Sequence, residues 1–147
     1  MKEIKSNVWD LLDEQSVVCI LTNNMILSNG KNIMGGGIAK EASDRNSGLE
    51  LIVGNAIKYN EYLIGIDNTT KAQMFRFPTK GAVWEKSEFG LIADSLHHLK
   101  EYAIQNPNLK IYLPRPGCGL GGLDWEDVKK LCECYLRDLD NVYIVTV

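Results

Sequence analysis

The sequence predicts one α/β domain, from its length, its hydrophobic content and the alternation of its apolar pattern. At 147 residues and 45% hydrophobic side chains, the chain has the size of an ordinary single domain and enough apolar surface for a buried core. Strand-like apolar runs alternate with stretches of helix-like spacing, and no repeat, low-complexity tract or linker interrupts them. We therefore expect residues 1–147 to form a single domain.

Strands are predicted where short runs rich in β-branched or aromatic residues occur. They lie near Glu3–Val8 and at Ser16–Thr22, Tyr62–Ile66, Ala72–Pro78, Lys110–Leu113 and Val142–Val147. Helical spacing predicts helices at Gly37–Ser43, Gly48–Asn60, Ser87–Gln105 and Trp125–Leu136. Capping oxygens and acidic side chains stand at two helix starts, where free backbone amides favour them: Ser87 with Glu88, and Asp124 before Trp125.

Charge and composition exclude several classes of protein. The net charge is −3 and the basic residues are scattered, which argues against tight, sequence-independent binding to a nucleic-acid backbone. The longest apolar run, Val17–Leu21, is too short to cross a bilayer, and the first five residues lack the apolar core of a signal peptide. We expect a soluble, cytoplasmic monomer with no membrane contact.

The four cysteines fit neither a metal site nor a disulfide framework. Cys132 and Cys134 lie two apart on a predicted helix and so point to different faces. Cys118 stands inside a glycine-rich segment, where it is either a nucleophile or a small residue suited to a crowded loop. We expect no metal and no cofactor.

Two glycine-rich clusters each follow a predicted strand and precede a predicted helix. The first runs from Met34 through Gly35, Gly36, Gly37 and Ile38 to Lys40, and the second from Pro116 through Gly117, Cys118, Gly119, Leu120 and Gly121 to Gly122. Free backbone amides and the positive end of a helix favour bound phosphate in this arrangement, although glycine also serves plain turns. Two such clusters in one short chain indicate a diphosphate held from both sides.

Other phosphate-binding folds fit the sequence less well. Gly117, Gly119 and Gly122 satisfy the spacing GxGxxG of a dinucleotide-binding fold, but that fold needs further strands and an acidic residue about 20 residues on. The chain here ends at Val147, within the next predicted strand. A Walker loop is excluded because neither cluster has Gly-Lys-Ser or Gly-Lys-Thr at the required position.

Taken together, these segments resemble the macrodomain family over nearly the whole chain. The resemblance rests on Asn23-Asn24 after an apolar strand, on the segment from Met34 to Ala39, and above all on Leu113 to Trp125. Within the family the chain is most similar to the branch of terminal ADP-ribose glycohydrolases, DNA de-ADP-ribosylating antitoxins, ADP-ribose 1″-phosphate phosphatases and short phage relatives. Thr79-Lys80 after a central strand matches a pair common in that branch. The resemblance implies a three-layer α/β/α macrodomain with a mixed central sheet of about six strands.

The resemblance also implies binding roles. Asn7, in the segment with Val8, takes the place of an acidic residue that accepts a hydrogen bond from adenine, and an amide oxygen also accepts such a bond. Asn23 and Asn24 would face the distal ribose. Backbone amides of the two glycine clusters would hold the diphosphate, because glycine permits a close approach. The residues concerned are Met34, Gly35, Gly36, Gly37 and Ile38 in the first cluster, and Pro116, Gly117, Cys118, Gly119, Leu120 and Gly121 in the second.

Lys80 is the candidate catalytic residue. In the glycohydrolase-like members the matching lysine is proposed to attack carbon C1″ of the distal ribose, whereas the alternative here is a charged lysine that only pairs with phosphate. Those enzymes carry an aspartate in the second cluster, and this chain has Gly121 there. Asp124 is the nearest acid, either as a general acid or base or as a helix cap.

Two remaining groups of side chains have plain alternatives. His97 and His98 lie in mid-helix, so at most one points inward, and packing or solvent exposure is the simpler role. Trp84 and Phe89 either cover a base or ribose or pack in the core.

Three functions follow from these observations. The leading one is a hydrolase of an ADP-ribosyl bond, whose leaving group is a protein carboxylate, a nucleobase, an acyl group or the 1″-phosphate. Its partners would be ADP-ribose or ADP-ribosylated protein or nucleic acid. The second is a non-catalytic ADP-ribose reader, which Gly121 favours. The third is a partner-binding domain that has lost its ligand, which the intact glycine clusters argue against.

Overall fold

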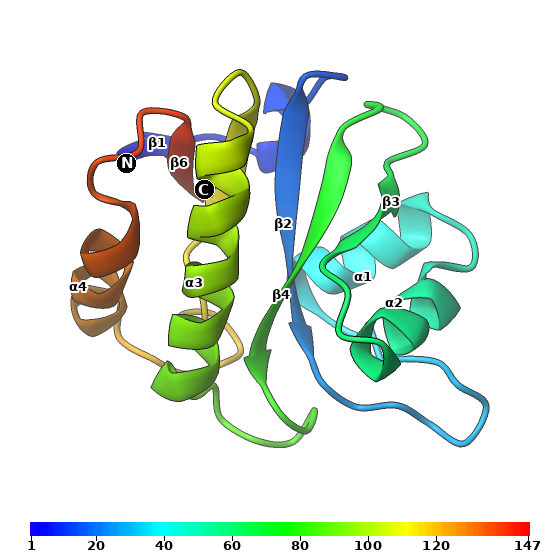
Figure 1. Cartoon of the computed structure of the whole chain (residues 1–147). Helices are drawn as coiled ribbons and strands as arrows, with labels where there is room; N and C mark the ends of the chain where they lie inside the picture. Colours follow the sequence, from blue (N-terminus) through cyan, green and yellow to red (C-terminus); the bar gives the residue numbers. More distant parts are fainter.

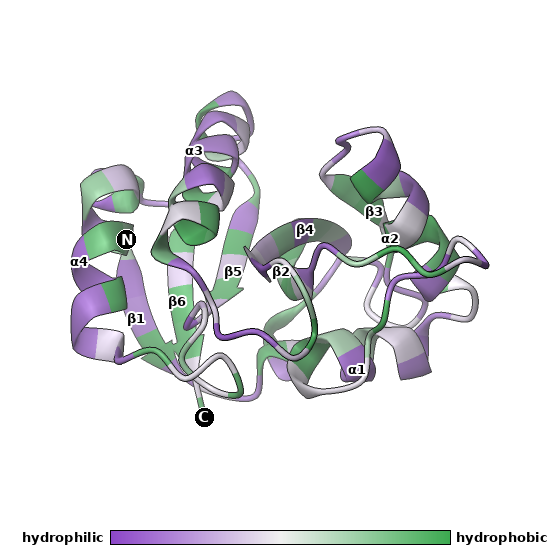
Figure 2. Cartoon of the chain, turned by 90° about the horizontal axis from the view of Figure 1, so that it is seen from below, coloured by the Kyte–Doolittle hydropathy of each residue, from purple (hydrophilic) through white to green (hydrophobic).

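The computed structural model describes residues 1–147 as a six-stranded mixed sheet between two pairs of helices. In space the strands are ordered β1, β6, β5, β2, β4, β3, and all neighbours run parallel except β3, which is antiparallel to β4 at one edge. Helices α3 and α4 cover one face, and α1 and α2 cover the other (Figures 1 and 2). The predicted three-layer α/β/α architecture and mixed sheet are confirmed.

The bounds of the elements follow the apolar patterning closely. The strands are β1 (Lys2–Lys5), β2 (Ser16–Asn23), β3 (Leu63–Ile66), β4 (Gln73–Lys80), β5 (Lys110–Pro114) and β6 (Val142–Thr146). The helices are α1 (Gly37–Arg45), α2 (Leu49–Lys58), α3 (Phe89–Gln105) and α4 (Trp125–Leu136), with a short 3₁₀ helix, η1, at Val8–Leu11. No helix is both long and apolar enough to span a bilayer.

Several predicted boundaries differ from the structure by one to three residues, and two of these differences have a clear local cause. The first strand ends at Lys5 rather than Val8, because the Asn7 side chain accepts a hydrogen bond from the Trp9 amide and starts η1 there. Helix α3 starts at Phe89, and Ser87 is not its cap, because the Ser87 hydroxyl points to Thr79 instead. By contrast, Asp124 caps α4 as predicted, accepting a hydrogen bond from the Glu126 amide at 3.2 Å.

Each face of the sheet carries its own hydrophobic core, because alternate side chains of a strand point to opposite faces. Phe77 of β4 packs with Leu96 and Val128 of α3 and α4 on one side. Ile20 of β2 packs with Val53 of α2 on the other. Both cores lie between the sheet and its helices. The loops at the strand ends lie outside these cores and can form a site.

A buried carboxylate fixes the far end of α1, the helix that the first glycine cluster opens. Asp67 is fully buried, and its oxygens accept hydrogen bonds from the Arg45 guanidinium at 3.2 and 3.0 Å, from Asn46 Nδ2 at 2.9 Å, and from Thr70. Burial alone would raise the pKa of Asp67, but these hydrogen bonds outweigh it and hold the pKa well below its usual range. The helix is therefore anchored at its last turn.

Candidate functional site

The candidate site lies at the carboxyl ends of the central strands. β2 is flanked by β5 on one side and β4 on the other, and the chain leaves β2 and β4 toward opposite faces of the sheet. Open α/β sheets bind ligands in the crevice that such a divergence creates. Two cavities of about 510 and 520 Å³ lie there, and they adjoin because Leu21, Gly37, Ile38 and Gly119 line both.

The first glycine cluster brings the amino end of α1 to this crevice. Gly36 precedes the helix without any side-chain cap, and Gly37 adopts a φ of 57°, which glycine tolerates best. None of the backbone amides from Gly35 to Ile38 donates a hydrogen bond within the chain. Free amides at the positive end of a helix are suited to bind an anion.

The segment that leads into this cluster is held by close backbone packing. Gly54 of α2 lies so near the Gly30 carbonyl oxygen that a Cβ at position 54 would overlap it. Asn23 at the end of β2 donates from Nδ2 to the Ile33 carbonyl at 2.9 Å and accepts from Asn32 Nδ2 at 2.8 Å. These contacts set where the free amides of the first cluster lie.

The second glycine cluster follows β5 and faces the first across the crevice. The five amides from Gly117 to Gly121 donate no hydrogen bond within the chain. A Cβ at position 121 would overlap Ser87 Oγ and lie 2.7 Å from the Gly117 carbonyl oxygen. Leu120 reaches across to the first cluster, where its Cδ1 would meet a Cβ at Gly36 at 2.7 Å. The two loops therefore meet at the first cavity, which both Leu120 and Gly36 line.

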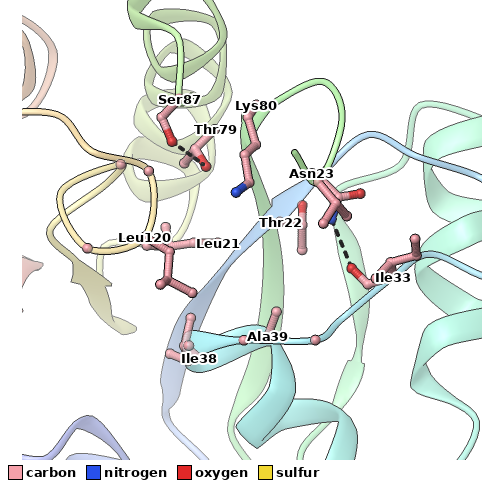
Figure 3. Close-up of a pocket in the computed structure, with 17 residues that line it drawn as sticks. Leu21, Thr22, Asn23, Ile33, Ile38, Ala39, Thr79, Lys80, Ser87 and Leu120 are labelled. Atoms are coloured by element: carbon pink, nitrogen blue, oxygen red, sulfur yellow. Dashed lines mark hydrogen bonds between the residues drawn. The ribbon is translucent and has the colours of Figure 1, made fainter. Parts of the chain in front are cut away.

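Lys80 lies at one end of the crevice, in the first cavity. It is the last residue of β4, and Figure 3 shows its amino group pointing into the space between Thr79, Thr22 and Leu21. Pairing with β2 shifts in register here, because Thr22 pairs with Pro78 and Asn23 with Lys80, which leaves Thr79 without a partner. Such bulges redirect side chains, and both Thr79 and Lys80 line the cavity.

The first cavity holds no acidic side chain. Its polar side chains are the lysine, one amide and three hydroxyls, contributed by Lys80, Asn23, Thr22, Thr79 and Ser87. Ser87 Oγ donates to Thr79 Oγ1 at 3.5 Å (Figure 3). Lys80 therefore has no carboxylate beside it in this cavity to take or return a proton.

The second cavity lies on the far side of the junction, against the start of η1 and the end of β6. Asn7, Val8 and Cys118 line it, with Glu41 as its acidic residue. Burial raises the pKa of the Cys118 thiol, and its Sγ donates to the Pro116 carbonyl at 3.4 Å. The surroundings of Cys118 favour a structural thiol over a nucleophile.

Four of the predicted site residues line neither cavity. Asn24 accepts a hydrogen bond from Arg76 at 3.4 Å in a separate small hollow, and Met34 is buried in the core. Pro116 contributes its carbonyl oxygen to the Cys118 contact, and Asp124 caps α4. The predicted residues that line the crevice are Asn7, Val8, Asn23, Gly35, Gly36, Gly37, Ile38, Lys80, Gly117, Cys118, Gly119, Leu120 and Gly121.

Solved structures resemble this chain closely in fold. The macrodomain of Thermus aquaticus DarG matches with a TM-score of 0.77 at 20% identity, covering 98% of this chain and 95% of that one. The macrodomain of Mycobacterium tuberculosis DarG matches with a TM-score of 0.76 at 25% identity, covering 100% and 98%. The chain has the macrodomain fold.

A third similar structure is Thermosipho africanus DarTG in complex with ADP-ribose, with a TM-score of 0.73 and 25% identity. The match covers 90% of the present chain and 38% of that longer chain. No protein-family model matches the sequence, and the search of curated proteins found no match. The similarity of this chain to known proteins therefore rests on solved structures alone.

The histidines and exposed aromatics lie away from the two cavities. His97 faces Glu101 at 3.2 Å, and His98 stacks on Tyr62 with ring centroids 4.2 Å apart. Trp84 is 79% exposed and does not pack in the core. No group of three or more histidine, cysteine, aspartate or glutamate side chains comes together in a way that could hold a metal ion.

The hydroxyls of Thr22, Thr79 and Ser87 were given no role in the site from the sequence, although Thr79 belongs to the pair with Lys80 that supports the resemblance. Thr79 is adjacent to Lys80 in the sequence, but the sequence does not reveal the register shift that accompanies their placement in one cavity. Ser87 reaches the site from the start of α3, and no sequence pattern signals that contact.

Proposed function

We propose that this macrodomain binds ADP-ribose along both cavities and hydrolyses the bond between its distal ribose and an attached group. The observation that carries the proposal is the order of features along the crevice: the second cavity, two facing rows of free amides, and then Lys80 in the first cavity. ADP-ribose consists of adenosine, a diphosphate and a second ribose in this order, which matches the order of the features. The structure of Thermosipho africanus DarTG with ADP-ribose supports it.

Binding follows from the two cavities and the loops between them. Adenine and its ribose occupy the second cavity beside Asn7 and Val8, where apolar walls favour the base. The diphosphate lies between the two glycine clusters and accepts hydrogen bonds from amides that otherwise have no partner. The distal ribose then enters the first cavity, near Asn23 and Lys80.

Lys80 acts as the nucleophile in this proposal. Its neutral amine attacks C1″ of the distal ribose, and the bond from C1″ to the leaving group breaks with its electron pair on that group. Water then adds to C1″, the bond to nitrogen breaks, and ADP-ribose and the lysine are released. Because no carboxylate lines this cavity, the proton that the amine releases passes to water or to a ligand oxygen. Asp124 has no part in these steps, since it caps α4.

The absence of a carboxylate from the first cavity favours a second candidate, a non-catalytic ADP-ribose reader. Gly121 leaves the first cavity without the aspartate that the glycohydrolase-like members carry, and no other acid replaces it. In that case Lys80 contributes only positive charge next to the diphosphate.

Substrate turnover with a matched lysine variant separates the two. The wild type, Lys80→Ala and Lys110→Ala would be incubated with ADP-ribosylated DNA, glutamate-linked ADP-ribosyl protein and ADP-ribose 1″-phosphate, with ADP-ribose binding measured by calorimetry. Lys110 begins β5 at the opposite end of the strand from the crevice. We expect turnover of one substrate that only Lys80→Ala abolishes, while binding persists. Binding without turnover in the wild type would leave the reader, and an absence of ADP-ribose binding would refute both.

A further inference from the structure

Ser87 joins the second glycine cluster to the rest of the molecule. Its side chain is 5% exposed and lines the first cavity. Its backbone amide donates to the Gly121 carbonyl at 3.1 Å. Apart from the adjacent Leu123, Ser87 is the only residue outside 116–122 that hydrogen-bonds to this loop. The loop with five free amides is thus hydrogen-bonded to a distant part of the chain at one point only, the contact between Ser87 and Gly121.

On its other side Ser87 contacts the end of β4. Its hydroxyl donates to Thr79 Oγ1 at 3.5 Å, and the next amide, that of Glu88, donates to the Thr79 carbonyl at 2.9 Å. Thr79 is the residue that the register shift leaves unpaired, and it immediately precedes Lys80. Residues 87–88 therefore bridge the glycine loop and the strand end that carries the lysine.

Glycines allow this bridge to be tight. A Cβ at position 121 would overlap Ser87 Oγ, and a Cβ at Gly117 would lie 3.0 Å from Ser87 Cβ. The loop backbone thus packs directly on the serine with no side chain between them. Ser87 therefore lies between the loop backbone and the strand end that carries Lys80, and its hydroxyl stands where a side chain at position 121 would begin.

We propose that Ser87 is a positioning residue that keeps the diphosphate-binding loop and Lys80 in register, so that C1″ of a bound ligand reaches the lysine amine. This inference rests on the proposed function, because it needs ADP-ribose in the crevice. Ser87→Ala keeps the amide contact to Gly121 and removes the hydroxyl that spaces the loop from Thr79. Small displacements of a reacting group slow a reaction steeply, by about 100-fold for 1 Å, while the diphosphate contacts that dominate affinity remain.

Reductive trapping tests the placement without requiring turnover. Free ADP-ribose carries an aldehyde at C1″ in its open form. The Lys80 amine condenses with it to an imine with loss of water, and cyanoborohydride reduces the imine to a stable secondary amine that intact-mass and peptide mass spectrometry detect. At saturating ADP-ribose we expect Ser87→Ala to trap the ligand on Lys80 at least about 10-fold more slowly than the wild type, with the affinity for ADP-ribose changed by less than about 3-fold. Ser43→Ala, on α1, serves as the matched serine control.

A double-mutant cycle with Thr79→Val shows whether the effect passes through the bridge. If the two hydroxyls act through one contact, Thr79→Val slows trapping, and Ser87→Ala with Thr79→Val together slow it no more than the stronger single change. Trapping at the wild-type rate in Ser87→Ala, or strictly additive effects, would overturn the inference while leaving the proposed function intact. A wild type that does not bind ADP-ribose would overturn the proposed function, and the inference with it.

Discussion

Two glycines in the second cluster, Gly121 and Gly119, have opposite surroundings, so we expect their substitution by alanine to have opposite effects on stability and on ligand binding. A Cβ at Gly121 would overlap Ser87 Oγ and crowd the Gly117 backbone, whereas a Cβ at Gly119 meets no atom within 4 Å. Gly119 has no positive φ and lines both cavities. A methyl group at 119 is thus harmless to the empty protein but enters the space where the diphosphate must approach the loop backbone.

The sizes of both effects follow from the contacts. Forcing a methyl group into packed surroundings costs about 2 kcal/mol, so Gly121→Ala should lower the melting temperature by about 6 °C, at about 3 °C per kcal/mol for a chain of this length. Gly119→Ala should melt within about 1.5 °C of the wild type. It should nevertheless lose one charge-assisted hydrogen bond to the diphosphate, about 1.5–3 kcal/mol, which weakens ADP-ribose binding about 10- to 150-fold.

Thermal melting by circular dichroism and titration calorimetry with ADP-ribose measure both quantities on the same samples. If Gly119→Ala binds ADP-ribose as tightly as the wild type, the ligand does not approach this backbone. If Gly121→Ala melts at the wild-type temperature, the close packing of Ser87 on the loop carries no cost.

Three further predictions concern stability and reactivity. The pKa of Asp67 is lowered in the folded protein, so its stabilising effect is present above about pH 4, the unfolded value, and is lost as the pH falls further. Asp67→Asn should therefore reduce the loss of unfolding free energy at acid pH, measured by denaturant titration at several pH values. An unchanged loss would contradict the assignment. Gly54→Ala should lower the melting temperature by about 6 °C through its clash with the neighbouring loop, while Gly90→Ala, with open space around it, should raise or preserve it; equal effects would disprove the packing argument. Iodoacetamide at pH 7.5 should modify the exposed Cys134 well before Cys118, whose thiol pKa is raised by burial, and the reverse order in peptide mapping would contradict that.

Local patterning predicted the elements and the two loops, because apolar period and glycine clusters act over a few neighbouring residues. It placed every α-helix and strand within a few residues, although it missed the short 3₁₀ helix η1, and it located both rows of free amides. Lys80 was singled out by the family resemblance rather than by local patterning, and the structure puts it in the first cavity. The helices, strands and glycine clusters depend on short stretches of chain, so they can be predicted without knowing the fold.

Contacts between distant segments escaped the sequence. Ser87 and Gly121 lie far apart along the chain, and only the packed structure brings the serine hydroxyl against the glycine. The register shift that leaves Thr79 unpaired depends on how β4 meets β2. Asn24 was expected at the distal ribose, yet it turns toward Arg76, because a strand end can direct adjacent side chains to different sides.

Amide chemical shifts test most directly whether the two glycine clusters hold the diphosphate. In ¹H–¹⁵N spectra of the uniformly labelled protein titrated with ADP-ribose, we predict the largest shifts at the amides of Gly35–Ile38 and Gly117–Gly121, none of which has a partner within the chain. ADP should move the same amides but leave Lys80 less affected. Saturable shifts confined to other residues, or no shifts at millimolar ADP-ribose, would contradict a diphosphate site on these loops.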